Sequence, residues 1–86
     1  MTRQEKLLKR FLSKPRDFSY DEMRKLLKGY GYKEIRSGRS SGSRVAFFNE
    51  KSHHIIRLHR PHPKNTLKRY QLDLIEEELK NRRVLK

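Results

Sequence analysis

The sequence predicts an α+β fold in which a three-stranded antiparallel sheet carries helices on one face and leaves the other face open. Three observations indicate it. Apolar residues recur at helical spacing near both ends of the chain, two short apolar runs flank the turn-like segment 49–52, and the glycine- and serine-rich segment 37–42 separates these runs from one further strand. The 86 residues are therefore expected to form a single domain, 1–86, with one modest core.

The N-terminal segment predicts a short helix. Thr2 and Glu5 have the spacing of a capping box, apolar residues follow at helical spacing, and Pro15 ends the pattern. We interpret residues 1–14 as a helix appended to the main body of the domain.

In the main body, residues 18–80, one helix is predicted before the strands and one after them along the chain. Ser19 and Glu22 form a second capping box at the start of the first, and Asn65 is expected to cap the last. The basic tail, 81–86, is expected to be frayed. The apolar face of the last helix is predicted to consist of Leu67, Tyr70, Leu72, Leu74, Ile75 and Leu79.

Alternation along the strands predicts which side chains reach the open face. The predicted strands are residues 32–36, 44–48 and 54–59. If the large apolar residues of the last two strands face the helices, the residues between them point outward. Arg44, Arg57 and His59 would then share the open face, although a slip of one residue in the register would reverse the assignment.

The charge of the chain indicates an anionic partner. There are 23 lysines and arginines against 10 aspartates and glutamates, a net charge of +13. The alternative is that the basic residues only form a solvated surface. So large a net charge, however, opposes compaction of the chain and attracts polyanions, among which nucleic acid is the first candidate. A membrane surface fits less well because the basic residues are dispersed. No apolar run approaches the roughly 18 residues that span a bilayer, and cysteine is absent, so we expect a cytoplasmic protein.

The order of short motifs resembles the HicA (YcfA-like) toxins of bacterial toxin–antitoxin pairs. The resemblance runs from about Phe18 to Leu79, and each motif alone is weak. Their order and spacing make the match. The motifs are Gly31-Tyr32, Gly42-Ser43-Arg44, Leu58-His59-Arg60-Pro61-His62 and Asn65-Thr66-Leu67-Lys68.

This resemblance implies a fold similar to a double-stranded-RNA-binding domain, mRNA cleavage without a metal or cofactor, and a HicB-type antitoxin that covers the active site. One position departs from the family pattern. The usual catalytic histidine follows the Gly-Ser pair directly, and here Arg44 stands in its place. The segment Ser52-His53-His54 imitates the family's Gly-Ser-His-His but falls a hairpin too late, so we interpret it as unrelated to catalysis.

Other residues can supply the chemistry of metal-free RNA cleavage. His59 and His62 are the candidates for proton transfer, because histidine titrates near neutrality and His62 lies between two prolines just before a predicted helix start. Arg44 remains protonated and is expected to stabilise charge. A metal site is disfavoured because cysteine is absent and the carboxylates cluster in the helices. A non-catalytic RNA-binding module remains the alternative. The candidates for RNA binding are Arg39, Ser43, Arg57, Arg60, Lys64, Lys68 and Arg69.

Overall fold

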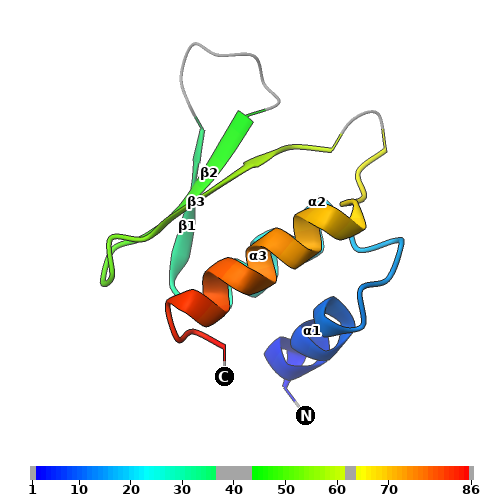
Figure 1. Cartoon of the computed structure of the whole chain (residues 1–86), viewed down its shortest axis with the longest axis horizontal. Helices are drawn as coiled ribbons and strands as arrows, with labels where there is room; N and C mark the ends of the chain where they lie inside the picture. Colours follow the sequence, from blue (N-terminus) through cyan, green and yellow to red (C-terminus); the bar gives the residue numbers. More distant parts are fainter. Residues whose placement is uncertain (1, 37–43, 62–63, 86) are drawn as a thin grey trace.

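The computed structural model describes residues 2–36, 44–61 and 64–85. Its elements are α1 (Arg3–Leu12), α2 (Tyr20–Gly29), β1 (Tyr32–Arg36), β2 (Arg44–Asn49), β3 (Ile55–His59) and α3 (Arg69–Asn81). The strands form one antiparallel sheet with β2 in the middle. All three helices lie on the same side of this sheet (Figure 1), which confirms the predicted α+β fold with one open face. None of the helices in the described ranges is both long and apolar enough to span a membrane.

The first two helices begin where the capping signals predict. The hydroxyl of Thr2 accepts a hydrogen bond from the backbone N–H of Glu5 at 3.1 Å. Ser19 and Glu22 form the complete box, because each side chain accepts a hydrogen bond from the backbone N–H of the other residue. Gly31 follows α2 with a φ of +94°, a left-handed conformation that glycine adopts without steric cost and that turns the chain into β1.

The register of the sheet is the one that alternation predicts. Arg44 pairs with His59 and Ala46 pairs with Arg57 across β2 and β3, while Ala46 faces Ile35 of β1 on its other side. The residues between them point toward the helices and are buried. These inward residues are Tyr32, Val45, Phe47, Ile56 and Leu58. The predicted strands differ from the observed ones at two ends. Strand β2 ends one residue later than predicted, and β3 begins one residue later.

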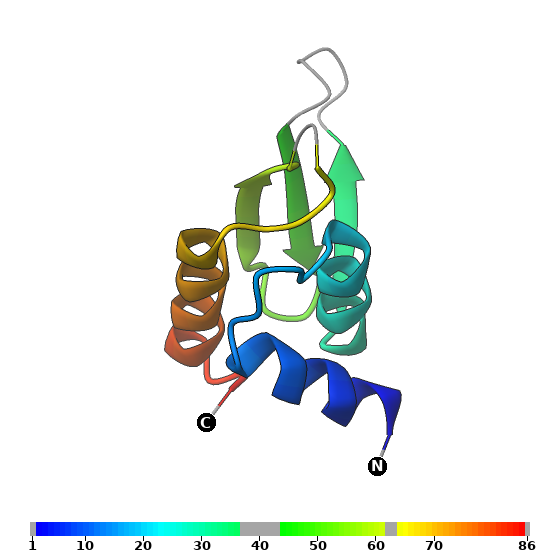
Figure 2. The same ribbon diagram turned by 90° about the vertical axis from the view of Figure 1, so that its right-hand side faces the viewer.

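The core lies between the sheet and the helices that cover one of its faces. Figure 2 shows α2 and α3 side by side over one face of the sheet, with α1 lying across their ends. Each of the two central helices contributes a buried apolar stripe that faces the sheet. These stripes consist of Tyr20, Met23, Leu26 and Leu27 from α2 and of Leu72, Ile75 and Leu79 from α3.

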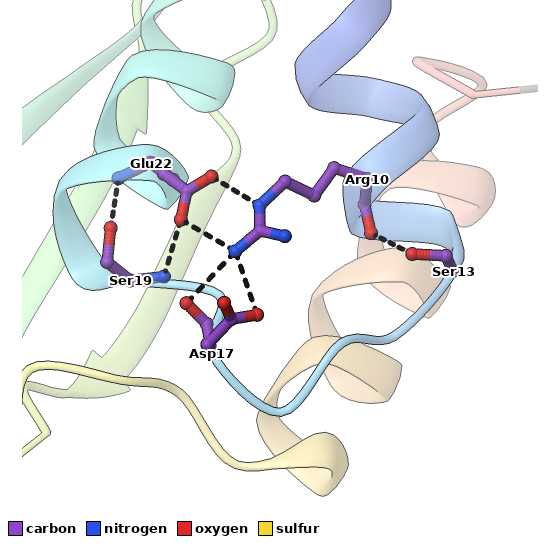
Figure 3. A network of polar contacts seen from close by, with 5 residues as sticks. All are labelled: Arg10, Ser13, Asp17, Ser19 and Glu22. Atoms are coloured by element: carbon purple, nitrogen blue, oxygen red, sulfur yellow. Dashed lines mark hydrogen bonds and ion pairs between the residues drawn. The ribbon is translucent and has the colours of Figure 1, made fainter.

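Helix α1 is joined to this body by burial and by polar contacts. Phe11 is fully buried, and its ring centroid lies 5.8 Å from that of Phe18. On α1 the guanidinium of Arg10 bonds Glu22 at 2.6 Å and Asp17 at 2.9 Å (Figure 3), which lowers the pKa of the Glu22 carboxyl. The same carboxylate accepts the backbone N–H of Ser19, so one side chain caps α2 and holds α1.

Lys14 joins the end of α1 to α3. Its side chain is only 11% exposed and forms ion pairs with Asp73, at 2.6 Å, and with Glu76. Burial opposes the charge of Lys14, but the hydrogen bonds to the two carboxylates outweigh it and raise the lysine pKa. The bonds from Lys14 and Lys80 lower the pKa of Glu76.

The last helix begins later than the sequence predicts. Asn65 does not cap it, because the chain there pairs with the entry to α2, where Thr66 and Ser19 form an isolated antiparallel bridge. The Tyr20 N–H donates to the Asn65 carbonyl at 3.0 Å, and the Leu67 N–H donates to the Phe18 carbonyl at 2.8 Å. Leu67 is therefore buried in this connection and not on the helix, and α3 begins at Arg69.

The later start rotates the apolar face of α3. Tyr70 and Leu74, which were predicted to lie on that face, are 60% and 57% exposed. Gln71 takes the buried place in the first turn. The tail is also more ordered than expected, since Leu85 packs into the core and its N–H donates to the Leu79 carbonyl.

The burial of Phe11 predicts that α1 contributes to global stability. Phe11→Ala should lower the free energy of unfolding by about 3–5 kcal/mol, the usual cost of emptying a buried aromatic site. Leu12→Ala is the matched control, because Leu12 is 44% exposed and its loss should cost less than about 1 kcal/mol. Urea denaturation followed by circular dichroism measures both. Equal and small effects would show that α1 is dispensable for the fold.

Candidate functional site

The outward face of the sheet brings three of the predicted site residues together. Arg44 at the start of β2 lies directly opposite His59 at the end of β3. Arg57 lies one outward position from His59 on the same strand and opposite Ala46. Directly opposed residues on one face of an antiparallel pair have Cβ atoms roughly 4.5–5.5 Å apart. The two guanidinium groups and the imidazole therefore rise from neighbouring positions on one end of the sheet.

A depression of about 550 Å³ lies on this face. One of its lining residues is Ala46, which is the only alanine of the chain and occupies the middle of the central strand. The larger side chains around this small residue form the walls. The depression is lined by Ile35, Arg44, Val45, Ala46, Arg57, Leu58 and His59.

The charges at this depression are unpaired within the described part of the chain. Neither Arg44 nor Arg57 forms an ion pair with any described carboxylate. The acidic residues lie on or beside the helices, with the exception of Glu34, which faces inward, and Glu50, which pairs with Lys33 at the opposite end of the sheet. The end of the sheet that holds His59 is therefore cationic.

The backbone at His59 is anchored from α3. Gln71, which is 9% exposed, donates from Nε2 to the His59 carbonyl at 3.1 Å. Its Oε1 accepts the N–H of Lys68 at 3.0 Å. One buried amide therefore holds the end of β3 against the start of α3, and it leaves the His59 side chain on the open face.

The next residue is anchored as well. The Arg60 guanidinium carbon lies 5.2 Å from the ring centroid of Tyr20, a cation–π distance. The Tyr20 hydroxyl in turn donates a hydrogen bond to Glu34. Arg60, which was predicted to bind RNA, is thus held over an aromatic ring of α2, and its exposed side chain remains able to contact a ligand.

The basic residues near α3 are only partly where the sequence predicted. Lys68 is the N-cap of α3 and Arg69 is its first residue. Lys64 precedes Asn65, the residue that was expected to cap the helix, and lies in the connection before α3 because the helix begins at Arg69. All three side chains are exposed.

His62, Arg39 and Ser43 lie outside the described residues. For His62, the observed bounds of α3 contradict one of the reasons for choosing this residue as a candidate. The residue was placed just before a helix N-terminus, but α3 begins at Arg69, seven positions later. The phosphate-binding argument from an adjacent helix start is therefore wrong.

The other two described histidines lie away from this end of the sheet. His53 is exposed in the β2–β3 turn with a φ of +61°. His54 points inward and is 4% exposed. Its Nε2 donates to Glu78 at 2.8 Å, and its Nδ1 lies 2.7 Å from the Tyr32 hydroxyl, whose pKa is raised by burial. Because a carboxylate only accepts, a neutral His54 ring accepts from Tyr32 and links β1, β3 and α3.

Three residues of the site were missed from the sequence alone. Ile35 and Ala46 follow from the same alternation that placed Arg44, once the register of β1 is known. Gln71 carries no local signal, because its two partners are contributed by β3 and by the N-cap of a helix whose start was misplaced. No group of three metal-binding side chains is found among the described residues.

Comparison with known proteins identifies the family. A model of the family described as the HicA toxin of bacterial toxin–antitoxin matches residues 20–81, which is most of the chain. The chain therefore belongs to the HicA toxin family. It is the toxin of a toxin–antitoxin pair, and an antitoxin partner follows from that class. No curated protein and no solved structure matches the chain.

The buried contacts of His54 predict a structural role that can be separated from catalysis. His54→Ala should lower the free energy of unfolding by about 1–3 kcal/mol, because it leaves the Tyr32 hydroxyl buried without its partner. In a double-mutant cycle with Tyr32→Phe, the two changes should be non-additive by at least roughly 0.5 kcal/mol. His53→Ala with Tyr32→Phe is the control pair and should be additive. Additivity in both cycles would contradict the contact.

Proposed function

We propose that this toxin is a metal-independent mRNA endoribonuclease whose substrate binds the outward face of the sheet. The observation that carries the proposal is the direct pairing of Arg44 with His59, on a cationic end of the sheet in a chain of a toxin family. A proton-transfer group and a fixed positive charge at adjacent positions are what cleavage of a phosphodiester by the neighbouring 2′-hydroxyl requires.

The reaction divides into two proton transfers and one displacement. A base removes the proton of the 2′-hydroxyl, and the 2′-oxygen attacks the phosphorus. The bond from phosphorus to the 5′-oxygen breaks, and an acid protonates that oxygen. The products carry a 2′,3′-cyclic phosphate and a 5′-hydroxyl, so no water or metal enters this step. Negative charge accumulates on the phosphoryl oxygens during the displacement.

Each residue of the site has a role in this scheme. His59 transfers a proton, and His62 remains the candidate for the second transfer. Arg44 stabilises the charge of the phosphoryl group, because a guanidinium stays protonated and offers several donors in one plane. Arg57 binds a phosphate beside it.

The remaining RNA contacts and the partner extend this site. We assign contacts with backbone phosphates to the other RNA-binding candidates of the chain, and the antitoxin is of the HicB type and covers this face. The site of action is the cytoplasm, where mRNA is available. The assigned phosphate contacts are Arg39, Ser43, Arg60, Lys64, Lys68 and Arg69.

A second function class is supported by one specific observation. Arg44 stands where the family's usual histidine is expected, and arginine does not transfer protons at neutral pH. A non-catalytic RNA-binding module would keep the cationic face and lose cleavage. Cleavage by the purified protein separates the two.

The proposal predicts distinct effects for the paired residues. His59→Ala should lower the rate of RNA cleavage by about 10²- to 10⁴-fold, because it removes a proton-transfer group. Arg44→Ala should lower it by about 10²- to 10³-fold, because it removes a charge that stabilises the transition state. His53→Ala is the matched control and should retain the wild-type rate. Single-turnover cleavage of a labelled RNA, with each variant checked for folding by circular dichroism, measures all three.

Two results would contradict this assignment. Loss of cleavage in folded His53→Ala, with His59→Ala fully active, would move the site to the turn at the other end of the sheet. Wild-type protein that binds RNA but yields no product with a 2′,3′-cyclic phosphate would favour the binding module.

A further inference from the structure

We propose that the depression over Ala46 is a subsite for the base of one unpaired nucleotide, so that the ligand of this face is single-stranded RNA. This inference rests on the proposed function and names the form of RNA that the same site accepts. It follows from the shape of the depression, from the chemistry of its floor and from the charges at its rim.

The shape results from a single small residue. Outward positions on β2 alternate Arg44, Ala46 and Phe48, and Ala46 is flanked across the strands by Ile35 and Arg57. The short methyl group of Ala46 beside the longer side chains of Ile35, Arg44 and Arg57 leaves a hollow. Its volume of about 550 Å³ falls within the range of pockets that bind small ligands.

The floor and the rim differ in chemistry. The Ala46 methyl provides an apolar floor and Ile35, which is 46% exposed, adds apolar surface on the β1 side, whereas Arg44, Arg57 and His59 contribute polar and charged groups. A nucleotide has the same division, with a flat and largely apolar base face and an anionic phosphate. Guanidinium planes also stack on bases in RNA complexes. A base on Ala46 would direct its phosphate toward the pair Arg44 and His59.

The same features exclude a duplex from the hollow. Bases in a double helix are stacked and paired, and A-form RNA presents its backbone and shallow groove to a protein. A duplex could contact the two arginines but could not place a base on Ala46. A protein partner is also a poorer match for the hollow itself, since a standard interface buries about 800 Å² on each side, far more than this single depression offers.

One variant tests the hollow without changing the charge. Ala46→Ile fills it with a branched aliphatic side chain, which a strand accommodates well and which offers no aromatic plane on which a base could stack. Ile55→Leu is the control, because Ile55 also points outward but does not line the depression. Binding is measured with a 2′-O-methyl RNA octamer, which cannot be cleaved through its 2′-oxygen, with the same backbone lacking bases, and with a duplex of the octamer.

Wild-type protein and Ile55→Leu should bind the single strand about tenfold more tightly than the abasic backbone, the order of one base stacked on a protein side chain. Ala46→Ile should abolish this difference and leave the abasic affinity and the salt dependence unchanged, because the arginines remain. The duplex should bind no more tightly than the abasic strand.

Three outcomes would overturn the inference, and they differ from one another. Equal affinity of the wild type for base-bearing and abasic strands removes the subsite while leaving the RNA site intact. No binding of any oligonucleotide removes the proposed function as well. If Ala46→Ile binds RNA normally but no longer binds the antitoxin encoded beside the toxin, the hollow is a protein interface. Thermal unfolding of both variants shows whether each is folded.

Discussion

The antiparallel pairing of β2 with β3 in one register is the constraint on which the site depends. Side chains alternate between the two faces of a strand, so a shift of one residue would exchange the core and the site. Val45, Phe47, Ile56 and Leu58 would then face solvent, and arginines would enter the core. The energy of burying these four residues therefore fixes the position of Arg44 opposite His59, at no separate cost to the fold.

The distribution of acidic residues has a comparable consequence on the other side of the molecule. Carboxylates on α2 and α3 are used to hold α1, through Arg10 and Lys14, or to hold His54. With its acidic residues engaged there, a chain of net charge +13 presents an end of its sheet on which no described carboxylate neutralises the arginines. Helix α1 lies outside the family match. It contributes Phe11 to the core, and its ion pairs help to keep acidic side chains apart from the arginines of the sheet.

The sequence predicts the local parts of this structure well and its long-range contacts poorly. Caps such as Ser19–Glu22 and the alternation around Arg57 are properties of a few neighbouring residues, and both are confirmed. The start of α3 was misplaced because Asn65 has the composition of a cap, yet its carbonyl is used by Tyr20, 45 positions earlier in the chain. Gln71 was missed for the same reason. The hollow depends on three strands together, so no single motif reveals it.

The most direct test of the account observes the centre of the outward face while RNA binds. Because Ala46 is the only alanine, labelling with [methyl-¹³C]alanine gives one methyl signal in an NMR spectrum. If RNA binds this face, the signal should shift progressively during titration with the uncleavable single-stranded octamer and stop shifting at saturation. A methyl signal that stays unchanged while the protein becomes saturated with RNA would contradict binding to this face, because the RNA would then be bound elsewhere on the molecule.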